Sequence, residues 1–322
     1  MLNWVLNSYV RECLFQEKRG ALVSRKLYTA LTLLSLIWGG SFLFIKVLLG
    51  GFDPWAVAFL RSGFGLIVIT LVMLIGRKPF GWSKIPWIPM IFIALINTAI
   101  PWALIGFSET RLDSSIASIL NATTPLWTIV VGVVLFRSIT SRLQWLGMGV
   151  ALVGLVILVG LDSGSLVSVN PIGLVEILCA TLCYGLGTHL AKRFLKGLTM
   201  YQLTFATLLT AMVGSGILAF STGKVEFSHL ASWPIFSSAI GVGVFGAGLA
   251  YILFYFMIQE GSPEFATMVT YLVPITAIVW GFLLLHEQVS WNMLIGLVLI
   301  LGGVYVANLK KTPAIATVSS KS

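Results

Sequence analysis

Residues 114–136, SSIASILNATTPLWTIVVGVVLF, recur in altered form at residues 263–285, PEFATMVTYLVPITAIVWGFLLL. A shift of 149 positions matches three residue pairs, Ala117 with Ala266, Pro125 with Pro274 and Gly132 with Gly281. Each stretch is long and apolar enough to cross the hydrocarbon core of a bilayer as a helix, which takes about 20 residues. The chain is therefore predicted to contain a duplicated unit built from membrane-spanning helices.

The composition of the whole chain agrees with a membrane protein. Of its 322 residues, 58% are hydrophobic and 10% are charged, whereas a soluble domain carries about 25% charged residues. Because backbone polar groups must be satisfied within lipid, apolar runs of this length are helices and not strands of a barrel. We predict an all-α polytopic membrane protein with ten transmembrane helices. They cover residues 28–49, 54–76, 86–107, 114–136, 142–161, 171–191, 199–220, 233–258, 264–285 and 291–309.

The duplication covers these spans from the first to the last. A second shift, of 146 positions, aligns Trp38-Gly39 and Lys46 with Tyr184-Gly185 and Lys192. The chain thus divides into two five-helix repeats, residues 28–161 and 171–309. Since five is an odd number, the second repeat enters the membrane with the opposite orientation. Inverted repeats recur in secondary transporters, where the binding site lies near the midplane between the repeats.

Paired glycines recur on the fifth and tenth predicted spans, namely Gly147 with Gly154 and Gly296 with Gly303. Small residues on one helix face allow two helices to approach closely. We expect these glycines either to pack the two halves together or to form a dimer surface. The sequence leaves the choice between a monomer and a homodimer open.

Basic residues are concentrated on one side of the predicted membrane. All but four of the 20 Lys and Arg residues fall on the side of the N-terminus, the exceptions being Lys46, Arg61, Arg111 and Lys224. By the positive-inside rule this side is the cytoplasm, which predicts a multi-pass protein of the cell membrane with both termini cytoplasmic. Residues 1–27 are then a cytoplasmic extension, and its first 25 residues are either an interfacial helix or an extension without a role. Residues 310–322 form a cytoplasmic tail. The net charge of +9 is spread over short loops, which excludes a nucleic-acid-binding domain.

Several short motifs follow one another along residues 28–309: Trp38-Gly39-Gly40-Ser41-Phe42 with Lys46, Pro54 with Arg61, Ala117 with Pro125, and then Pro274, Gly281, His286-Glu287 and Gly296. In this order they resemble the EamA-type members of the drug/metabolite transporter superfamily. Members often carry a carboxylate after the fourth span as well as after the ninth, but here Ser138 corresponds to Glu287. The resemblance implies an exporter whose cargo is an amino acid, another metabolite or a drug.

A polar face is predicted on the fourth span, where Ser118 and Asn121 follow Ser114 at helical spacing. The repeat shift carries Ser118 and Asn121 onto Thr267 and Thr270 of the ninth span. Two such faces would line a central substrate cavity; alternatively, the hydroxyls bond to carbonyls of their own helix and allow close packing. Because Asn is costly against lipid and the pattern occurs twice, we favour the cavity.

Aromatic residues at repeat-matched positions are candidates for the walls of the same cavity. Trp38 corresponds to Tyr184, and Trp102 corresponds to Tyr251. Their rings and hydrogen-bond donors suit a small ligand, although Trp and Tyr also serve as interfacial anchors and packing residues. Further candidates for the substrate site are Asn97, Tyr255 and Tyr271.

Ionisable residues inside predicted spans are functional candidates. Glu176 and His189 of the sixth span are candidates for proton coupling, although each lies close enough to a membrane surface to reach water. Arg61 of the second span either holds a substrate carboxylate or forms an ion pair or a headgroup contact, and the second interpretation is favoured. Lys46 and Lys192 are expected to anchor helix ends.

Together these observations predict a secondary transporter that moves a small metabolite, such as an amino acid, outward by alternating access through a central cavity. A multidrug or toxic-compound efflux transporter is the nearest alternative, and an intramembrane enzyme or a receptor is a more distant one. We expect no enzymatic activity, because the sparse acids form no catalytic constellation. No cofactor or metal site is expected; residues 241–246 match a dinucleotide-binding pattern but lie within a lipid-length apolar run.

Overall fold

The structure is a computed structural model that describes the backbone of residues 2–159, 169–221, 225–260 and 263–309. Within these ranges, side chains are described from Arg25 onward, except those of Tyr255, Gln259, Pro263 and Glu264. The predicted tail, residues 310–322, and the side chain of the candidate Tyr255 therefore lie outside the described residues.

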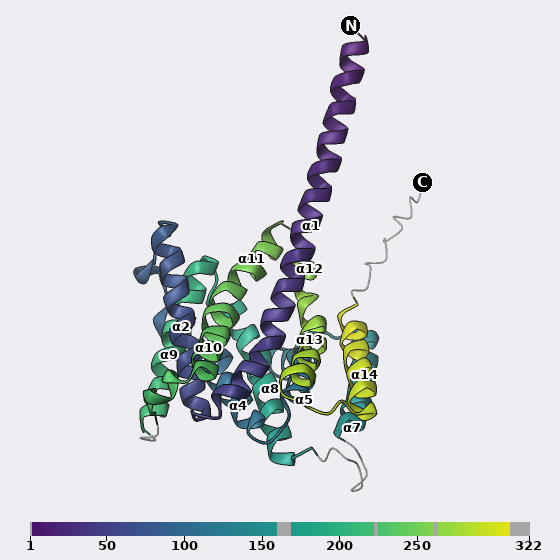
Figure 1. Cartoon of the computed structure of the whole chain (residues 1–322). Coiled ribbons are helices and arrows are strands. Elements are labelled where there is room, and N and C mark those ends of the chain that lie inside the picture. The colour runs from purple at the N-terminus through teal and green to yellow at the C-terminus, as the bar shows by residue number, and fades with distance from the viewer. Residues whose placement is uncertain (1, 160–168, 222–224, 261–262, 310–322) are drawn as a thin grey trace.

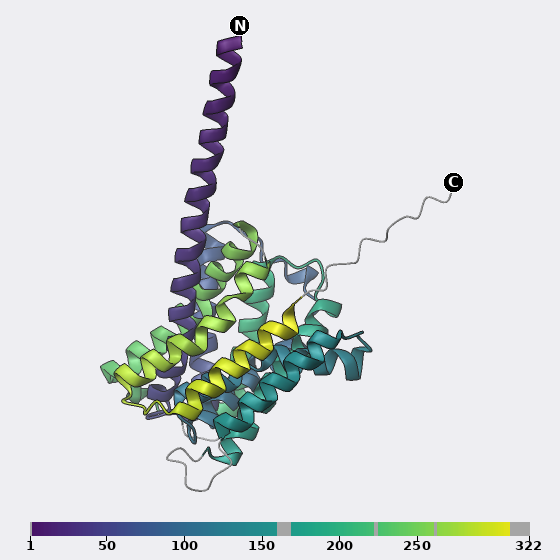
Figure 2. The same cartoon turned by 90° about the vertical axis from the view of Figure 1, so that its right-hand side faces the viewer.

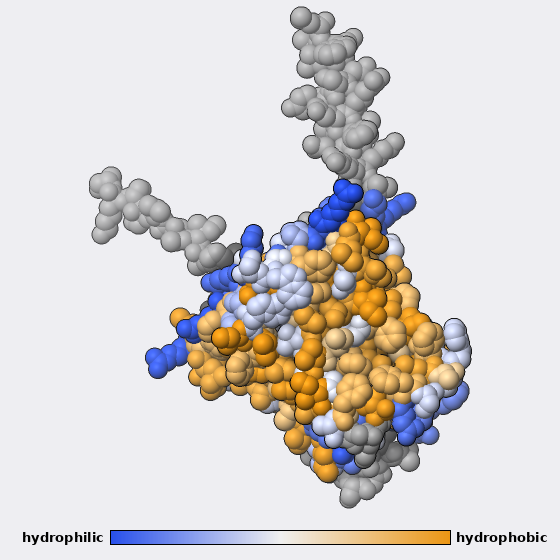
Figure 3. All heavy atoms as spheres, turned by 90° about the vertical axis from the view of Figure 1, so that its left-hand side faces the viewer, coloured by the Kyte–Doolittle hydropathy of each residue, from blue (hydrophilic) through white to orange (hydrophobic). Residues whose placement is uncertain are grey.

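Ten helical segments of the described ranges are long and apolar enough to cross a membrane, as the sequence predicts. Six spans are formed by unbroken helices: α1 (Leu2–Leu48, with its apolar part from Arg25), α2 (Pro54–Ile75), α7 (Arg142–Val159), α8 (Pro171–Phe194), α9 (Met200–Ser221) and α14 (Trp291–Asn308). In Figure 1, α1 enters the bundle from the top and α14 ends near the top, so we name this the upper end and the opposite one the lower end. Apolar side chains cover the middle of the bundle, and hydrophilic ones gather at its two ends (Figure 3).

The other four spans are interrupted helices at equivalent places in the two halves. The third span consists of α3 (Trp87–Ala94), η2 (Leu95–Ala99) and α4 (Ile100–Glu109), and the eighth consists of α10 (Trp233–Ile240), η4 (Gly241–Leu249) and α11 (Ala250–Glu260). The fourth span consists of α5 (Ser114–Asn121) and α6 (Thr124–Phe136), and the ninth of α12 (Pro263–Thr267) and α13 (Val269–Leu284). The connections carry two short 3₁₀ helices, η1 (Trp82–Lys84) and η3 (Phe227–Ala231).

The interruptions η2 and η4 are π-helical turns. The shift of 149 residues carries Leu95–Ala99 into the glycine-rich segment Gly241–Leu249, so the same irregularity occurs in both halves. Wide π-helical turns frequently occur at functional sites. The indole Nε1 of Trp38 on α1 donates a hydrogen bond of 3.2 Å to the carbonyl oxygen of Gly246 in η4. This bond connects α1 to the irregular part of the eighth span.

The two halves interleave, and contacts between them have mirror counterparts. α1 packs along α13, and correspondingly α8 packs along α6, while α2 pairs with α9 and α7 pairs with α14. At the first two crossings glycine permits the approach, because a Cβ on Gly39 would collide with Thr276 and one on Gly185 would lie 2.9 Å from the backbone N of Thr128. The chain is therefore an all-α polytopic membrane protein of two duplicated five-helix halves, as predicted.

Glycines also bring α7 and α14 together, as Figure 2 shows for the two neighbouring helices. A Cβ on Gly147 would collide with backbone atoms of Gly303 and Ala307, and one on Gly154 would lie 3.0 Å from the carbonyl oxygen of Gly296. The predicted glycine pairs thus pack the two halves of one chain against each other.

The turns after α6 and after α13 share one conformation. Arg137 and His286, at equivalent positions, have left-handed φ angles of 52° and 56°, which are uncommon for residues with a Cβ. In each turn the next residue donates its backbone N–H to a glycine carbonyl within the helix, Ser138 to Gly132 and Glu287 to Gly281. The side chains of Ser138 and Glu287 therefore occupy equivalent places at opposite ends of the bundle.

Candidate functional site

The four repeat-matched aromatic residues lie at the junction of the two halves. The rings of Trp38 on α1 and Tyr251 on α11 meet edge to face, with centroids 6.4 Å apart. Trp102 on α4 and Tyr184 on α8 pack together in one apolar cluster. Each half thus contributes two of the four aromatic residues to one cluster.

Arg61 of α2 belongs to the same cluster. Its guanidinium carbon lies 4.0 Å from the centroid of the Trp102 ring, and its charge acts electrostatically on Tyr184 and Tyr251. The residue is 9% exposed and its Nε has no hydrogen-bond partner. Among the described residues it forms no ion pair, so the ion-pair part of the favoured prediction is not seen there. The buried Nε of its guanidinium therefore has no acceptor in the described part of the chain.

The polar face of the fourth span is largely unsatisfied. The side-chain oxygens of Ser114, Ser118 and Asn121 are buried and have no hydrogen-bond partner among the described residues. By contrast, Thr124 donates to the carbonyl of Asn121 at the end of α5, and Thr128 donates to the carbonyl of Thr124 in its own helix. The alternative prediction, that these hydroxyls bond within their helix, therefore fails for Ser118 and fits its neighbours. Buried polar oxygens are normally hydrogen-bonded, so these oxygens are available to bind a polar ligand or a water molecule.

The equivalent face of the ninth span differs. Thr267 and Thr270 are exposed, and the hydroxyl of Thr270 donates to the carbonyl of Thr267 at 2.8 Å. Tyr271 turns towards α14, where its hydroxyl accepts a hydrogen bond from Asn308 at 3.2 Å. The structure thus brings the first of the two predicted polar faces into the bundle and leaves the second on its surface.

Asn97, the remaining candidate for the substrate site, lies in the π-helical turn η2 and packs against α8. A Cβ on Gly187 would lie 2.5 Å from its side-chain oxygen. In the mirror arrangement, a Cβ on Gly246 of η4 would lie 2.7 Å from the side-chain oxygen of Ser41 on α1. Asn97 therefore marks the junction between η2 and α8.

The two proton-coupling candidates lie apart from the aromatic cluster and from each other. Glu176 forms an ion pair with Arg111 at 2.9 Å near the lower end. His189 stacks on Phe136 with ring centroids 4.8 Å apart, and its Nε2 donates to the carbonyl of Thr128 at 2.9 Å. Each is thus engaged by a neighbouring span.

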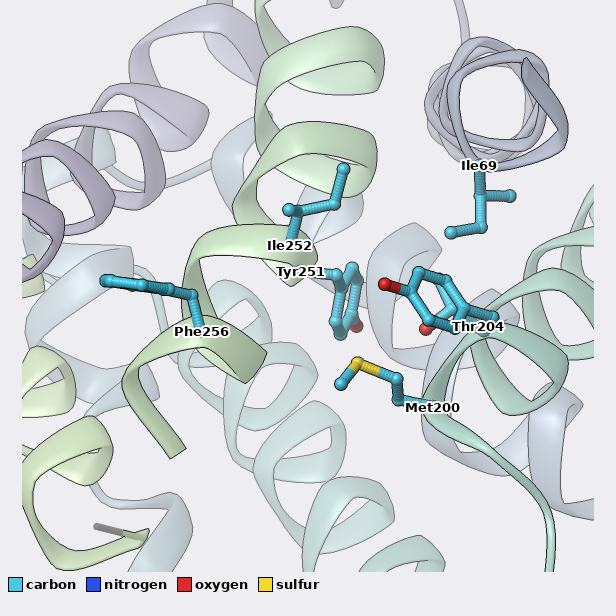
Figure 4. Close-up of a pocket in the computed structure, with 7 residues that line it drawn as sticks. Ile69, Met200, Thr204, Tyr251, Ile252 and Phe256 are labelled. Carbon is cyan, nitrogen blue, oxygen red and sulfur yellow. The ribbon is translucent and has the colours of Figure 1, made fainter. Parts of the chain in front are cut away.

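A pocket of about 200 Å³ opens in the upper half of the bundle, between α2, α9 and α11 (Figure 4). It is lined by Ile69, Met200, Tyr201, Thr204, Tyr251, Ile252 and Phe256. Figure 4 shows Tyr251 facing Met200 and the other side chains of α9. Because Tyr251 also contacts Trp38, it belongs both to the lining of this pocket and to the aromatic cluster.

Glu287, which follows α13, forms a hydrogen-bonded contact between the two halves at the lower end, which we name the lower closure. Its carboxylate accepts hydrogen bonds from the backbone N–H groups of Ser114, at 2.7 Å, and Ser115, at 3.1 Å, and from the Ser115 hydroxyl. A carboxylate at a helix N-terminus is stabilised by the free N–H groups and by the helix dipole. Glu287 thus ties the second half of the chain to the start of α5 in the first half.

Two further ionisable groups accompany this closure, and sequence analysis missed one of them. The Nζ of Lys46 donates hydrogen bonds to the backbone carbonyls of Glu109, at 2.5 Å, and Leu112, at 2.7 Å. Glu109 was not a candidate, because the predicted third span ended at residue 107. Its side chain is 0% exposed. The sequence contained a signal for Glu109, namely an acid directly after an apolar run. It lies at the same membrane side as Lys46 at the end of the first span.

Asp113 sits beside this group in the connection before α5. Burial raises the pKa of its carboxyl, the negative charge of Glu287 raises it further, and Lys46 opposes the change. The lower closure therefore holds more acids than bases.

Comparisons with known proteins agree with this architecture. The model of the EamA-like transporter family matches residues 26–160 and 171–309. The chain is 26% identical over 271 residues to an uncharacterized inner membrane transporter, YedA, of Escherichia coli strain K12, covering 82% of this chain and 84% of the relative. It is 22% identical to the uncharacterized transporter YoaV of Bacillus subtilis, over 84% of this chain and 93% of YoaV. Protein PecM of Dickeya dadantii is also 22% identical, over 84% of this chain and 88% of PecM.

One crystal structure supports the fold. It superposes with a TM-score of 0.61 at 14% sequence identity and covers 89% of this chain and 97% of the other. At this identity the likeness concerns the fold alone.

Proposed function

The chain belongs to the EamA-like transporter family, and from this membership we propose that it is a secondary transporter that exports small metabolites such as amino acids by alternating access. As a member it is a multi-pass membrane transporter of a small molecule. The cargo, the direction and the mechanism are the proposal. They rest on the aromatic cluster, on the position of Arg61 and on the distribution of charge along the chain.

The observation that carries the proposed cargo is the guanidinium of Arg61 stacked on Trp102. A buried Arg is suited to planar, two-point recognition of a carboxylate. Trp38, Tyr184 and Tyr251 add aromatic surface around it, as expected for a site that binds a small amphipathic ligand. A buried positive charge repels lipophilic cations, so the cluster favours an amino acid over a cationic drug.

The proposed direction uses the two ends of the bundle. Because basic residues are concentrated at the upper end, we assign this end and both termini to the cytoplasm. The pocket beside Tyr251 opens in this upper half, whereas Glu287 closes the lower end. In this state cargo would reach the cluster from the cytoplasm, which is where an exporter loads.

Uptake into inside-out membrane vesicles tests the proposal, since uptake there corresponds to export. We expect uptake of radiolabelled amino acids and no uptake of the amines that lack their carboxyl group. Arg61→Gln should reduce uptake at least tenfold, because one charge-assisted contact contributes about 1.5–3 kcal/mol, and Arg61→Lys should retain part of it. Transport of lipophilic cations in place of amino acids, or unchanged uptake by Arg61→Gln, would refute the proposed cargo.

A further inference from the structure

Glu109 at the lower end of α4 is a buried acid that the proposed cargo site does not use. The side chain is 0% exposed, and neither carboxylate oxygen has a hydrogen-bond partner in the described part of the chain. A buried carboxylate without partners is costly, and an ionisable group at this depth in a membrane protein is a functional candidate. Such a group calls for a cation, either a proton or a charged ligand.

Among the described residues, no basic side chain forms an ion pair with the Glu109 carboxylate. Lys46 of α1 acts on it electrostatically, but Lys46 donates its hydrogen bonds to the backbone carbonyls of Glu109 and Leu112. Arg61 of α2 and Glu287 after α13 also act on the carboxyl. On α8, which packs against α4, the acid near this end is Glu176, and Arg111 pairs with it. The charges around Glu109 are thus of both signs, and each base is directed elsewhere.

Glu109 lies on the same face of α4 as Trp102. The two residues are seven positions apart, which corresponds to about two helical turns or ~10 Å along the axis. Arg61 stacks on Trp102 at one end of this distance, and Glu109 marks the other. A zwitterion whose carboxylate binds Arg61 can therefore direct its ammonium group towards Glu109.

We propose that the Glu109 carboxylate is an exchangeable cation site, which holds either a proton or the ammonium group of the cargo. This inference rests on the proposed function and adds its coupling ion. On the cytoplasmic side the arriving ammonium displaces the proton, which leaves to the cytoplasm. When the closure by Glu287 opens, cargo departs and an external proton binds the carboxylate. One proton moves inward for each zwitterion that moves outward, and the charge on Glu109 remains compensated throughout.

Two assays on the full-length protein in proteoliposomes test the inference, with a radiolabelled amino acid as the probe. The first measures accumulation driven by a pH gradient, and the second measures exchange of labelled for unlabelled amino acid without a gradient. Glu109→Gln should abolish the driven accumulation but retain exchange with a KM raised about tenfold, the cost of one charged contact. Glu109→Asp should recover part of the driven accumulation.

A binding measurement separates coupling from a structural role. In weakly buffered detergent solution, adding the amino acid should release protons from the wild type and none from Glu109→Gln. Glu226→Gln is the matched control, because Glu226 is an exposed acid at the same end of the bundle, and it should behave as the wild type in all three assays.

Distinct results overturn the inference and the proposed function. The inference is overturned if driven accumulation persists in Glu109→Gln. It is also overturned if Glu176→Gln loses driven accumulation while Glu109→Gln retains it. If Glu109→Gln elutes as an aggregate, Glu109→Asp is measured in its place. A pH dependence of driven accumulation in Glu109→Asp that equals that of the wild type would also overturn the inference. If the wild type neither accumulates nor exchanges amino acids, the proposed function fails and the inference fails with it.

Discussion

The carboxylate of Glu287 accepts a hydrogen bond of 2.7 Å from the backbone N–H of Ser114, although the two residues belong to different halves of the chain. The Ser115 N–H and hydroxyl add to this contact. A single side chain thereby holds the first residues of α5 against the turn that follows α13. Under alternating access, these hydrogen bonds must break each time the lower end opens.

Replacing Glu287 by Ala should favour the state that is open at the lower end. Charge-assisted hydrogen bonds contribute about 1.5–3 kcal/mol each, so the equilibrium should shift about tenfold or more. The measurement is the labelling rate of Ser114→Cys by a membrane-impermeant maleimide, in a background in which Cys13, Cys179 and Cys183 are Ser. Glu226→Ala is the control for loss of an acid. Equal labelling rates with and without Glu287 would show that the contact does not hold this end closed.

Removing the unpartnered side chains of the fourth span should affect transport and leave stability intact. Ser118 and Asn121 form no hydrogen bonds with described residues through Oγ and Oδ1, so Ser118→Ala and Asn121→Ala remove no intramolecular bond. If these atoms contact the cargo, KM should rise about 2- to 10-fold, the equivalent of one hydrogen bond. Transport kinetics test the expected rise in KM. Thermal unfolding in detergent, measured on the same preparations, tests the expected unchanged stability. Thr128→Ala, which loses a bond within its own helix, should leave KM unchanged.

A methyl group at Gly147 should separate α7 from α14. Its Cβ would collide with backbone atoms of Gly303 and Ala307, and overpacking of this kind costs about 1–3 kcal/mol or more. Gly149 of the same helix has open space around the corresponding position. We therefore expect Gly147→Ala to lower the unfolding temperature and Gly149→Ala to preserve or raise it, since Ala favours helix. A similar loss for both variants would contradict the close approach of these helices.

Asp113→Asn should stabilise the protein in a pH-dependent manner. The folded-state pKa of Asp113 lies above its ordinary value of 3.8, because the carboxyl is partly buried and faces Glu287. The ionised carboxylate therefore destabilises the fold above that raised pKa, and the penalty fades as the pH falls through it towards 3.8. The Asn variant should unfold at a higher temperature at pH 7, with an advantage that shrinks on acidification. An advantage that grows towards low pH would reverse the sign of this argument.

Hydropathy and the repeat were sufficient to predict the spans and the inverted duplication. Local composition determines where an apolar helix can run, and the matched positions of Trp38 and Tyr184 required no tertiary information. The glycine pairs predicted either packing between the halves or a dimer surface, and the structure shows the first, because Gly147 of α7 lies against Gly303 of α14. The π-helical turns were not predicted, although the glycine-rich segment at residues 241–246 marked one of them.

The roles of ionisable residues were harder to predict, because burial of a charge depends on neighbours that are remote in sequence. Arg61 lies against Trp102 of α4, and the charges that act on Glu109 belong to Lys46, Arg61 and Glu287, all remote from it in the sequence. Sequence position alone made Glu176 look more deeply placed than Glu109, whereas the structure pairs Glu176 with Arg111 and buries Glu109 completely. Thr267 and Thr270 of the ninth span are exposed, whereas Ser118 of the fourth span is buried, so a repeated pattern does not guarantee a repeated environment.

The turns that carry Ser138 and Glu287 have the same backbone but different side chains, and this difference has a kinetic consequence. A serine cannot supply the anionic contact that Glu287 makes, so the barrier to exposing the cluster is expected to be higher on one side of the membrane than on the other. The transporter would then favour one direction of transport, and in its resting state the cargo site would be open to the cell interior. Leakage of external solutes inward would be limited by the same step that limits turnover, and a cell could keep such a transporter in its membrane at rest without losing its gradients.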